Sequence, residues 1–136
     1  MSALFLYGVL RADIAGEKIE PLLTGLGPGW SATVPGELWA IPDPQGWYPA
    51  LVPGEGPYAG TVQGMLHEAG DVDLAALDAF EGPHYQRTAL TVTSASGELP
   101  AMAWLYTAPL PDGAEPVPDG DFAAWLAETG RTPFTL

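Results

Sequence analysis

Residues 71–94 read DVDLAALDAFEGPHYQRTALTVTS and contain the clearest helix signal in the chain, followed directly by a strand signal. Asp71 or Asp73 can cap the start of the helix, and apolar residues then recur with the 3.6-residue period of an amphipathic helix. Gly82 and the proline after it end the helix, because glycine accepts the C-cap conformation and proline cannot continue the turn. A strand is predicted from Tyr85 onward.

Short strands separated by glycine and proline turns make up most of the remaining sequence. An apolar run at 3–10 is typical of a buried strand, and further strand patterns cover 33–41, 61–67 and 102–107. A second amphipathic helix follows near the end of the chain, with Gly130 as its stop. Short strands with two or three helices, in no regular β-α-β order, predict an α+β fold with a closed or nearly closed sheet.

The length and the charge of the chain limit its organisation and its partners. The 136 residues suit one domain spanning 1–136. Seventeen Asp and Glu against four Lys and Arg give a formal net charge of −13. We expect no binding to nucleic acid or to anionic membranes, since both require basic patches. No apolar run has the length of a membrane span or the profile of a signal peptide, so we expect a cytoplasmic protein. The oligomeric state stays open.

Several kinds of chemistry are excluded by absent residues and motifs. The sequence has no cysteine, which removes disulfides, thiolate catalysis and thiolate metal sites. His67 and His84 have no carboxylate partner at metal-ligand spacing, so we expect no metal site. There is no Gly-x-Ser-x-Gly elbow, phosphate loop or dinucleotide-binding fingerprint, and we expect no cofactor. Carboxylate pairs are too frequent in so acidic a chain for spacing alone to identify a catalytic pair.

Glu81 differs from the other acids because it lies at the predicted C-terminal end of the first helix. The negative end of the helix dipole disfavours a charged carboxylate there. Phe80 makes this helix end apolar, and desolvation raises the pKa of a carboxyl in the same direction. A carboxyl of raised pKa can accept a proton and return it, as general acid–base catalysis requires. From these residues alone, a catalytic carboxyl and a solvated acid in a last helical turn both stay open.

A set of sequence blocks occurs in the order typical of one known family. LDAFEG at 77–82 followed by YQR at 85–87, together with LFLYGVLR at 4–11, resembles the γ-glutamylcyclotransferase-like family, which includes the AIG2-like proteins. Shorter blocks that fit the same family lie at 34–38, 48–51, 62–66 and 103–106. The resemblance therefore extends in order from residue 4 to residue 106.

This resemblance implies a small mixed β-barrel with flanking helices and a pocket at one end. Members of the family cleave γ-glutamyl amides by cyclisation, a transferase- or lyase-type reaction that releases 5-oxoproline and a free amine. The α-amine of the substrate attacks its own γ-carbonyl, so the reaction needs no protein nucleophile, metal or cofactor. The resemblance assigns the proton transfers to Glu81 as general acid and base, and it implies a small γ-glutamyl molecule as partner.

The resemblance also assigns substrate binding to Tyr7, Gly8, Val9 and Leu10, whose backbone N–H groups would hold the α-carboxylate of the substrate. Gly8 would allow the substrate to approach the backbone closely. Val9 departs from the family, which commonly has serine or threonine there. A backbone contact survives this change, whereas a hydroxyl contact does not.

Aromatic and basic residues near these blocks are further candidates. Tyr85 and Tyr106 are predicted to line the pocket or to orient Glu81, and both are equally compatible with core positions. Arg87 is expected to fix local structure by pairing with an acid on a neighbouring strand. Arg11 is a further candidate for contact with the α-carboxylate.

Two functions from different classes stay open. The first is an enzyme that cyclises a γ-glutamyl amine or peptide, or transfers the γ-glutamyl group to another acceptor. The second is a non-catalytic small-molecule binding or interaction module on the same barrel, which Val9 favours. The acidic composition would repel anionic substrates, and it favours γ-glutamyl conjugates of amines with a cationic leaving group.

Overall fold

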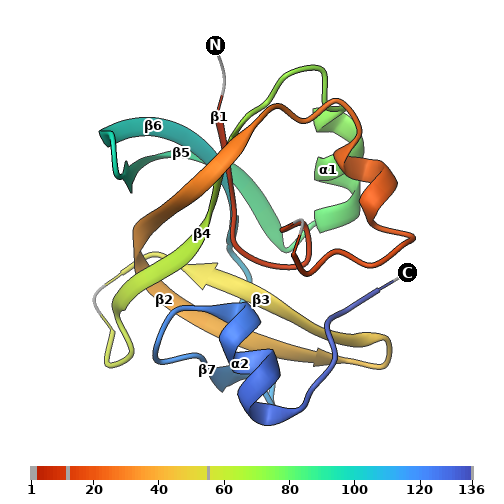
Figure 1. Cartoon of the computed structure of the whole chain (residues 1–136). Helices are drawn as coiled ribbons and strands as arrows, with labels where there is room; N and C mark the ends of the chain where they lie inside the picture. The colour runs from red at the N-terminus through yellow and green to blue at the C-terminus, as the bar shows by residue number, and fades with distance from the viewer. Residues whose placement is uncertain (1–2, 12, 55, 136) are drawn as a thin grey trace.

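The computed structural model describes residues 3–11, 13–54 and 56–135 and has the mixed helix and strand content that the sequence predicts (Figure 1). In chain order its elements are β1 (Ala3–Leu6), the 3-10 helix η1 (Glu20–Leu23), β2 (Gly29–Asp43), β3 (Gly46–Val52), β4 (Gly60–Glu68), α1 (Leu74–Glu81), β5 (Tyr85–Ser94), β6 (Gly97–Tyr106), β7 (Glu115–Pro116) and α2 (Phe122–Thr129). The α+β class is confirmed.

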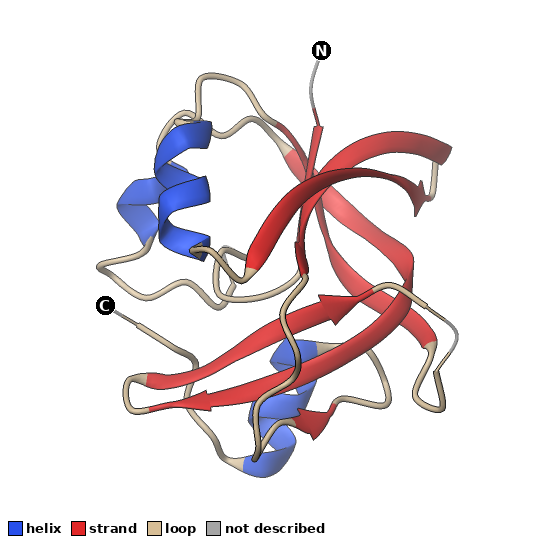
Figure 2. Cartoon of the chain, turned by 180° about the vertical axis from the view of Figure 1, so that it is seen from behind, coloured by secondary structure: helices blue, strands red, loops and turns tan. Residues whose placement is uncertain are grey.

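Five strands close into a mixed barrel in the order β2-β4-β1-β6-β5, because β5 pairs back with β2. β1 and β6 are parallel, whereas the other neighbours in the ring are antiparallel. β2 has 15 residues and pairs with four strands, β3, β4, β5 and β7. Its first part pairs with β4, and its second part forms a hairpin with β3 that extends beyond the barrel (Figure 2). The expected small mixed barrel with flanking helices is confirmed.

The barrel core is built from buried residues of the strands, which alternate with more exposed ones in the middle of β2 and follow one another in β1. Phe5, Val34 and Leu66 are almost completely buried. The helices add Leu77 from α1 and Phe122 from α2 to the same core. Both helices therefore cover the barrel by burying an apolar side chain in it, which is the main stabilising contribution of a short helix.

Besides β2, which starts at Gly29 and not at residue 33, two strands differ clearly from their predicted bounds. The apolar run at 3–10 forms a strand only to Leu6, because the chain turns where the Arg11 N–H donates to the Gly8 carbonyl at 2.8 Å. The strand predicted at 102–107 starts at Gly97, since its whole length pairs with β5 in one hairpin. In both cases pairing decides the boundary, and the apolar pattern does not.

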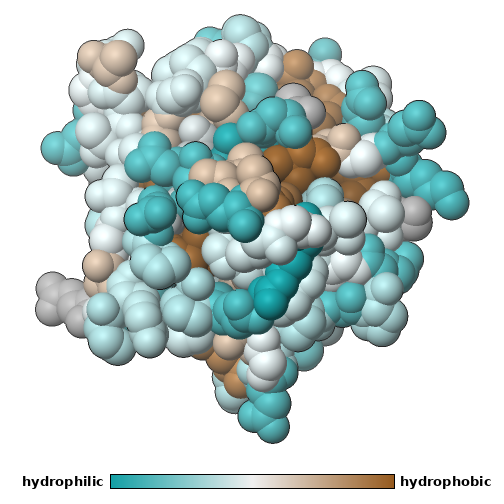
Figure 3. Space-filling model, turned by 60° about the horizontal axis from the view of Figure 1, so that its bottom comes forward, coloured by the Kyte–Doolittle hydropathy of each residue, from teal (hydrophilic) through white to brown (hydrophobic). Residues whose placement is uncertain are grey.

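Polar side chains dominate one face of the molecule. The face on which α2 lies is mostly hydrophilic, with separate hydrophobic patches between the polar groups (Figure 3). Within the described ranges, no helix combines the length and the apolar character needed to cross a membrane.

Candidate active site

A cavity of about 220 Å³ lies between the turn after β1, the end of α1, β3 and the C-terminal segment. It brings together six of the seven residues that the sequence singled out as catalytic or substrate-binding. These six are Tyr7, Gly8, Val9, Leu10, Glu81 and Tyr85. The structure therefore places the predicted residues around one cavity, and their roles in binding and catalysis stay predictions.

Glu81 is the last residue of α1, and local signals fix its position. The side chain of Asp73 caps the helix by accepting a hydrogen bond from the Ala76 N–H at 3.1 Å. Gly82 ends the helix with φ 85°, a value that favours glycine. Burial raises the pKa of Glu81 to about 8, and the nearby charge of Asp78 adds to the rise. The direction agrees with the sequence argument, and desolvation is its main cause.

Asp78, one helical turn before Glu81, links α1 to two strands of the barrel. Trp104 Nε1 donates to Asp78 Oδ1 at 2.9 Å, and Arg87 Nη2 lies 3.4 Å from Asp78 Oδ2. The acid that pairs with Arg87 thus lies on the helix, and the expectation of an acid on a neighbouring strand is wrong. Because Trp104 lines the cavity, this network connects the cavity wall to the helix that carries Glu81.

Two tyrosine side chains facing Glu81 are fixed by short hydrogen bonds. The Tyr7 hydroxyl donates to the Trp104 carbonyl at 2.6 Å and accepts from the Leu51 N–H at 3.2 Å. The Tyr85 hydroxyl donates to the Pro49 carbonyl at 2.6 Å. Burial raises the pKa of both phenols above the ordinary range, and the charge of Glu81 adds to the rise. Both therefore stay neutral at physiological pH and hold the wall in place.

The turn after β1 forms a second part of the wall. A side chain at residue 8 would overlap the Pro49 ring, so the close packing of this turn requires glycine. Among the described residues, the backbone N–H groups of Gly8, Val9 and Leu10 donate to no other group. Val9 is buried and adds an apolar side chain to the cavity. The turn thus presents backbone donors beside an apolar surface.

Arg11 stabilises this turn from outside the cavity. Its guanidinium donates to Asp13 from Nε at 3.0 Å and from Nη2 at 2.7 Å. Nη1 reaches Asp121, the N-cap of α2, at 3.3 Å. Arg11 is not part of the cavity lining. In the structure its guanidinium pairs with Asp13 and Asp121 and does not face the proposed α-carboxylate position.

Tyr106 is the one predicted site residue that does not line the cavity. It is buried in a second apolar cluster with Ile41 and Ala50. Its ring lies edge-on to Tyr85, with 5.2 Å between the ring centroids. The side chain of Tyr106 thus packs behind Tyr85, as the alternative of a core position predicts, and its contact with substrate stays a prediction.

The cavity also contains residues that the sequence did not single out as catalytic or substrate-binding. Asp43, Phe80, His84, Trp104 and Phe134 all belong to its lining. Of the family-like block at 48–51, Tyr48 and Pro49 are part of the lining. Nothing in the described part of the chain forms a group of three or more His, Asp or Glu side chains suited to a metal ion.

The fold and this cavity define a small-barrel protein with a partly open cavity that is lined by a carboxyl group of raised pKa. Comparison with protein families agrees with this class. The model of the family described as gamma-glutamyl cyclotransferase, AIG2-like, matches residues 4–125. The chain belongs to this family. A search of curated proteins found no match.

Solved structures share the fold at low sequence identity. The crystal structure of YkqA from Bacillus subtilis has a TM-score of 0.70 and 22% identity, over 95% of this chain and 42% of that one. An uncharacterised protein from Pyrococcus horikoshii has a TM-score of 0.67 and 18% identity, over 96% and 97% of the two chains. A mouse AIG2-like protein has a TM-score of 0.62 and 24% identity, over 82% and 81%. The present chain thus spans less than half of the Bacillus protein, and these likenesses show the fold.

Proposed function

We propose that this protein cleaves a γ-glutamyl amine or γ-glutamyl peptide by intramolecular cyclisation, with 5-oxoproline and a free amine as products. Glu81 acts as general acid and base. The observation that carries the proposal is that a carboxyl with a pKa of about 8 shares one cavity with a turn whose backbone N–H groups face no acceptor in the described chain. Membership of the family supports the reaction class.

The first step is removal of a proton from the α-ammonium group of the substrate. The carboxylate of Glu81 accepts this proton, and the positive charge of the α-ammonium favours the carboxylate before the transfer. The lone pair of the freed amine then forms a bond to the γ-carbonyl carbon, and the electrons of the C=O bond move to its oxygen. A five-membered ring results.

The second step breaks the original amide bond. The carboxylic acid of Glu81 donates its proton to the nitrogen of the leaving amine, the C–N bond breaks, and the carbonyl forms again. The resulting carboxylate of Glu81 then accepts the second proton of the attacking nitrogen, which the lactam does not retain, and passes it to the free amine. Glu81 thus returns to the carboxylate form, and both protons taken from the α-ammonium group leave with the product amine as an ammonium ion. A pKa near the working pH suits a group that transfers a proton in both directions.

The remaining task of the protein is to hold the substrate in a folded conformation. The backbone donors of the turn at 8–10 are suited to the α-carboxylate, because an N–H group binds an anion without a cationic side chain. The amine and the γ-carbonyl then approach within one bound molecule. Well-oriented intramolecular reactions reach effective molarities on the order of 10⁵–10⁸ M. Positioning is therefore the larger part of the proposed catalysis.

Charge favours a particular kind of leaving amine. Asp43 lines the cavity, and the formal net charge of the chain is −13. An anionic leaving group would be repelled, whereas an amine with a further positive charge would be attracted. γ-Glutamyl polyamines are therefore expected to have a higher kcat/KM than γ-glutamyl dipeptides, with a larger difference at low salt than at high salt.

Incubation of the protein with a panel of γ-glutamyl amides, followed by assay of 5-oxoproline, tests the proposal. We expect product from at least one amide, with one equivalent of amine for each 5-oxoproline. The rival function is a binding module without turnover, which the apolar Val9 in the cavity favours. Stabilisation of the protein by the amides without any 5-oxoproline would support that rival and overturn the enzyme.

A further inference from the structure

Residues 131–135 form a strap that crosses the tip of the β2–β3 hairpin and reaches the end of α1 (Figures 1 and 2). The family match ends at residue 125, before this strap begins. The Trp47 N–H donates to the Thr132 carbonyl at 2.9 Å, and the Phe134 N–H donates to the Trp47 carbonyl at 2.7 Å. The strap is therefore paired with β3 almost as an additional strand would be.

Side chains anchor the strap on both sides of this pairing. The Arg131 guanidinium lies 4.3 Å from the ring centroid of Trp47 and 5.2 Å from that of Trp125. The same group pairs with Glu115 at 2.6 Å. At the other end, Gln45 Nε2 donates to the Thr135 carbonyl at 3.1 Å. These contacts make the strap a fixed wall of the molecule.

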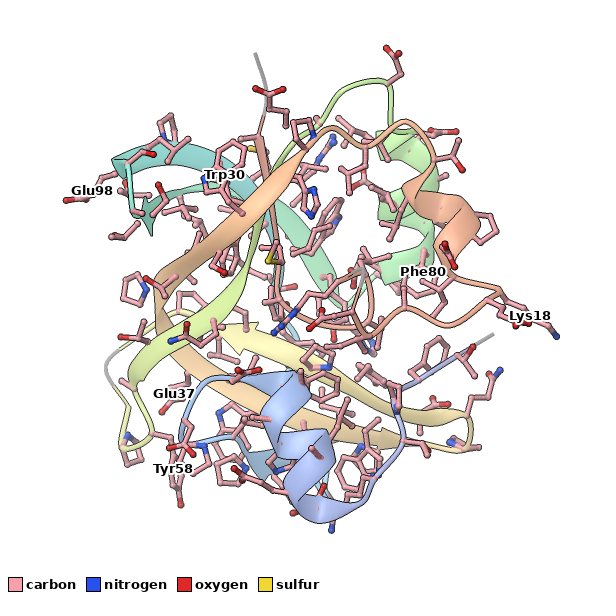
Figure 4. The ribbon with its side chains drawn as sticks, viewed as in Figure 1. Lys18, Trp30, Glu37, Tyr58, Phe80 and Glu98 are labelled. Carbon is pink, nitrogen blue, oxygen red and sulfur yellow. The ribbon has the colours of Figure 1, made fainter. Side chains whose placement is uncertain are left out.

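Phe134 is the strap residue that lines the cavity. Its ring centroid is 6.1 Å from Tyr48 of β3 and 6.1 Å from Phe80 of α1, with tilted or edge-on geometry in both pairs. Figure 4 shows Phe80 at the end of α1 that faces the C-terminal segment. Phe80 immediately precedes Glu81, so the aromatic surface starts beside the proposed proton donor.

We infer that Phe134, Phe80 and Tyr48 form a subsite for the amine part of the substrate and select leaving amines with an apolar or aromatic body. This inference rests on the proposed function. The leaving nitrogen must lie at the Glu81 carboxyl to receive its proton, and the turn at 8–10 takes the α-carboxylate end. The carbon atoms attached to that nitrogen then lie against the wall next to Glu81, which is the aromatic one.

Binding measurements in a Glu81→Gln background test this subsite without turnover. Calorimetry gives the Kd of γ-glutamylbenzylamide and of γ-glutamylmethylamide, which share the γ-glutamyl part and differ in the amine. We expect the benzylamide to bind more tightly, and Phe134→Ala to reduce the ratio of the two affinities about tenfold, the loss typical of an aromatic contact. The methylamide Kd should change less than twofold. Thr132→Ala is the matched control, because this exposed strap residue gives its carbonyl to the pairing and is not part of the lining.

Phe134→Ala could lower the affinity by displacing the strap and not by removing the aromatic contact. Phe134→Leu controls for this effect, because leucine keeps an apolar side chain at the position. The inference predicts a smaller fall of the same ratio, about threefold. An unchanged ratio in both variants, or failure of both amides to bind, would overturn it. The proposed function fails separately, if the protein with Glu81 intact binds the amides and forms no 5-oxoproline.

Discussion

The two α-helices are capped in the same way at both ends, but their last turns lie in different surroundings. Both α1 and α2 have eight residues. In each, an aspartate caps the start by accepting from the N–H three residues later, at 3.1 Å from Asp73 to Ala76 and at 3.3 Å from Asp121 to Ala124. Each ends at a glycine with positive φ. Their capping therefore does not distinguish a supporting helix from one that carries a site.

The difference lies in what the last turn of each helix faces. α2 buries Phe122, Trp125 and Leu126, and its last turn, with Glu128, is exposed. α1 buries only Leu77 fully, and it ends at Glu81 inside the cavity. A carboxyl near the end of a helix thus becomes unusual only where the surrounding fold removes it from water. The following predictions test this contrast.

Exchange of the two carboxyls for amides gives the largest expected difference. Glu81→Gln removes the group that transfers the proton, so kcat/KM for 5-oxoproline formation should fall at least about a hundredfold. Glu128→Gln changes an acid in the last turn of α2 that is not part of the cavity lining, and should leave kcat/KM within about twofold. Similar losses in the two variants would show that the position of the carboxyl in the cavity is irrelevant.

The dependence of stability on pH separates the two helix ends next. The pKa of Glu81 is about 8 in the folded protein and near 4.5 as the ordinary value, so the folded state retains a proton that the unfolded chain has lost. The free energy of unfolding should therefore fall as pH rises between these values, by about 1.4 kcal/mol per pH unit from this group.

Urea unfolding of the wild type and of Glu81→Gln at several pH values measures this contribution. The amide has no proton to lose, so the difference in stability between the two proteins should change by that slope over the window and become constant above pH 8. Parallel curves for the two proteins would contradict the raised pKa. Glu128→Gln serves as the control for the loss of a glutamate that is not part of the cavity lining.

The caps give the smallest expected effects. Asp73→Ala removes one hydrogen bond to the helix start and should lower the free energy of unfolding by about 1 kcal/mol. Asp121→Ala removes the equivalent bond and also one partner of the buried Arg11, so it should cost more. Equal losses in urea unfolding would show that the link between Arg11 and α2 contributes nothing.

The parts of the fold that the sequence predicts well are those set by neighbouring residues. The cap at Asp73, the stop at Gly82 and the strand from Tyr85 are local signals, and together they place Glu81 at a helix end. The ordered motifs then indicate the cavity turn at Tyr7–Leu10. Glu81, Tyr85 and the turn at Tyr7–Leu10 all line the same cavity in the structure.

Features that depend on long-range pairing are not visible in the sequence. Tyr85 and Tyr106 are partners in the same hairpin, yet only Tyr85 reaches the cavity, because its hydroxyl meets the Pro49 carbonyl of β3. Phe134 enters the lining because the strap pairs with Trp47, some ninety residues earlier in the chain. Neither a hydrophobic period nor a short motif predicts contacts between segments so far apart in the chain.

The state of the Glu81 carboxyl is the central claim, and a ¹³C NMR titration of the glutamate carboxyl carbons tests it most directly. The resonance that disappears in Glu81→Gln identifies the residue. We expect this resonance to titrate with a pKa of about 8. A Glu81 transition near the ordinary value of 4.5 would contradict the account, because the carboxyl would then be solvated and poorly suited to return the proton.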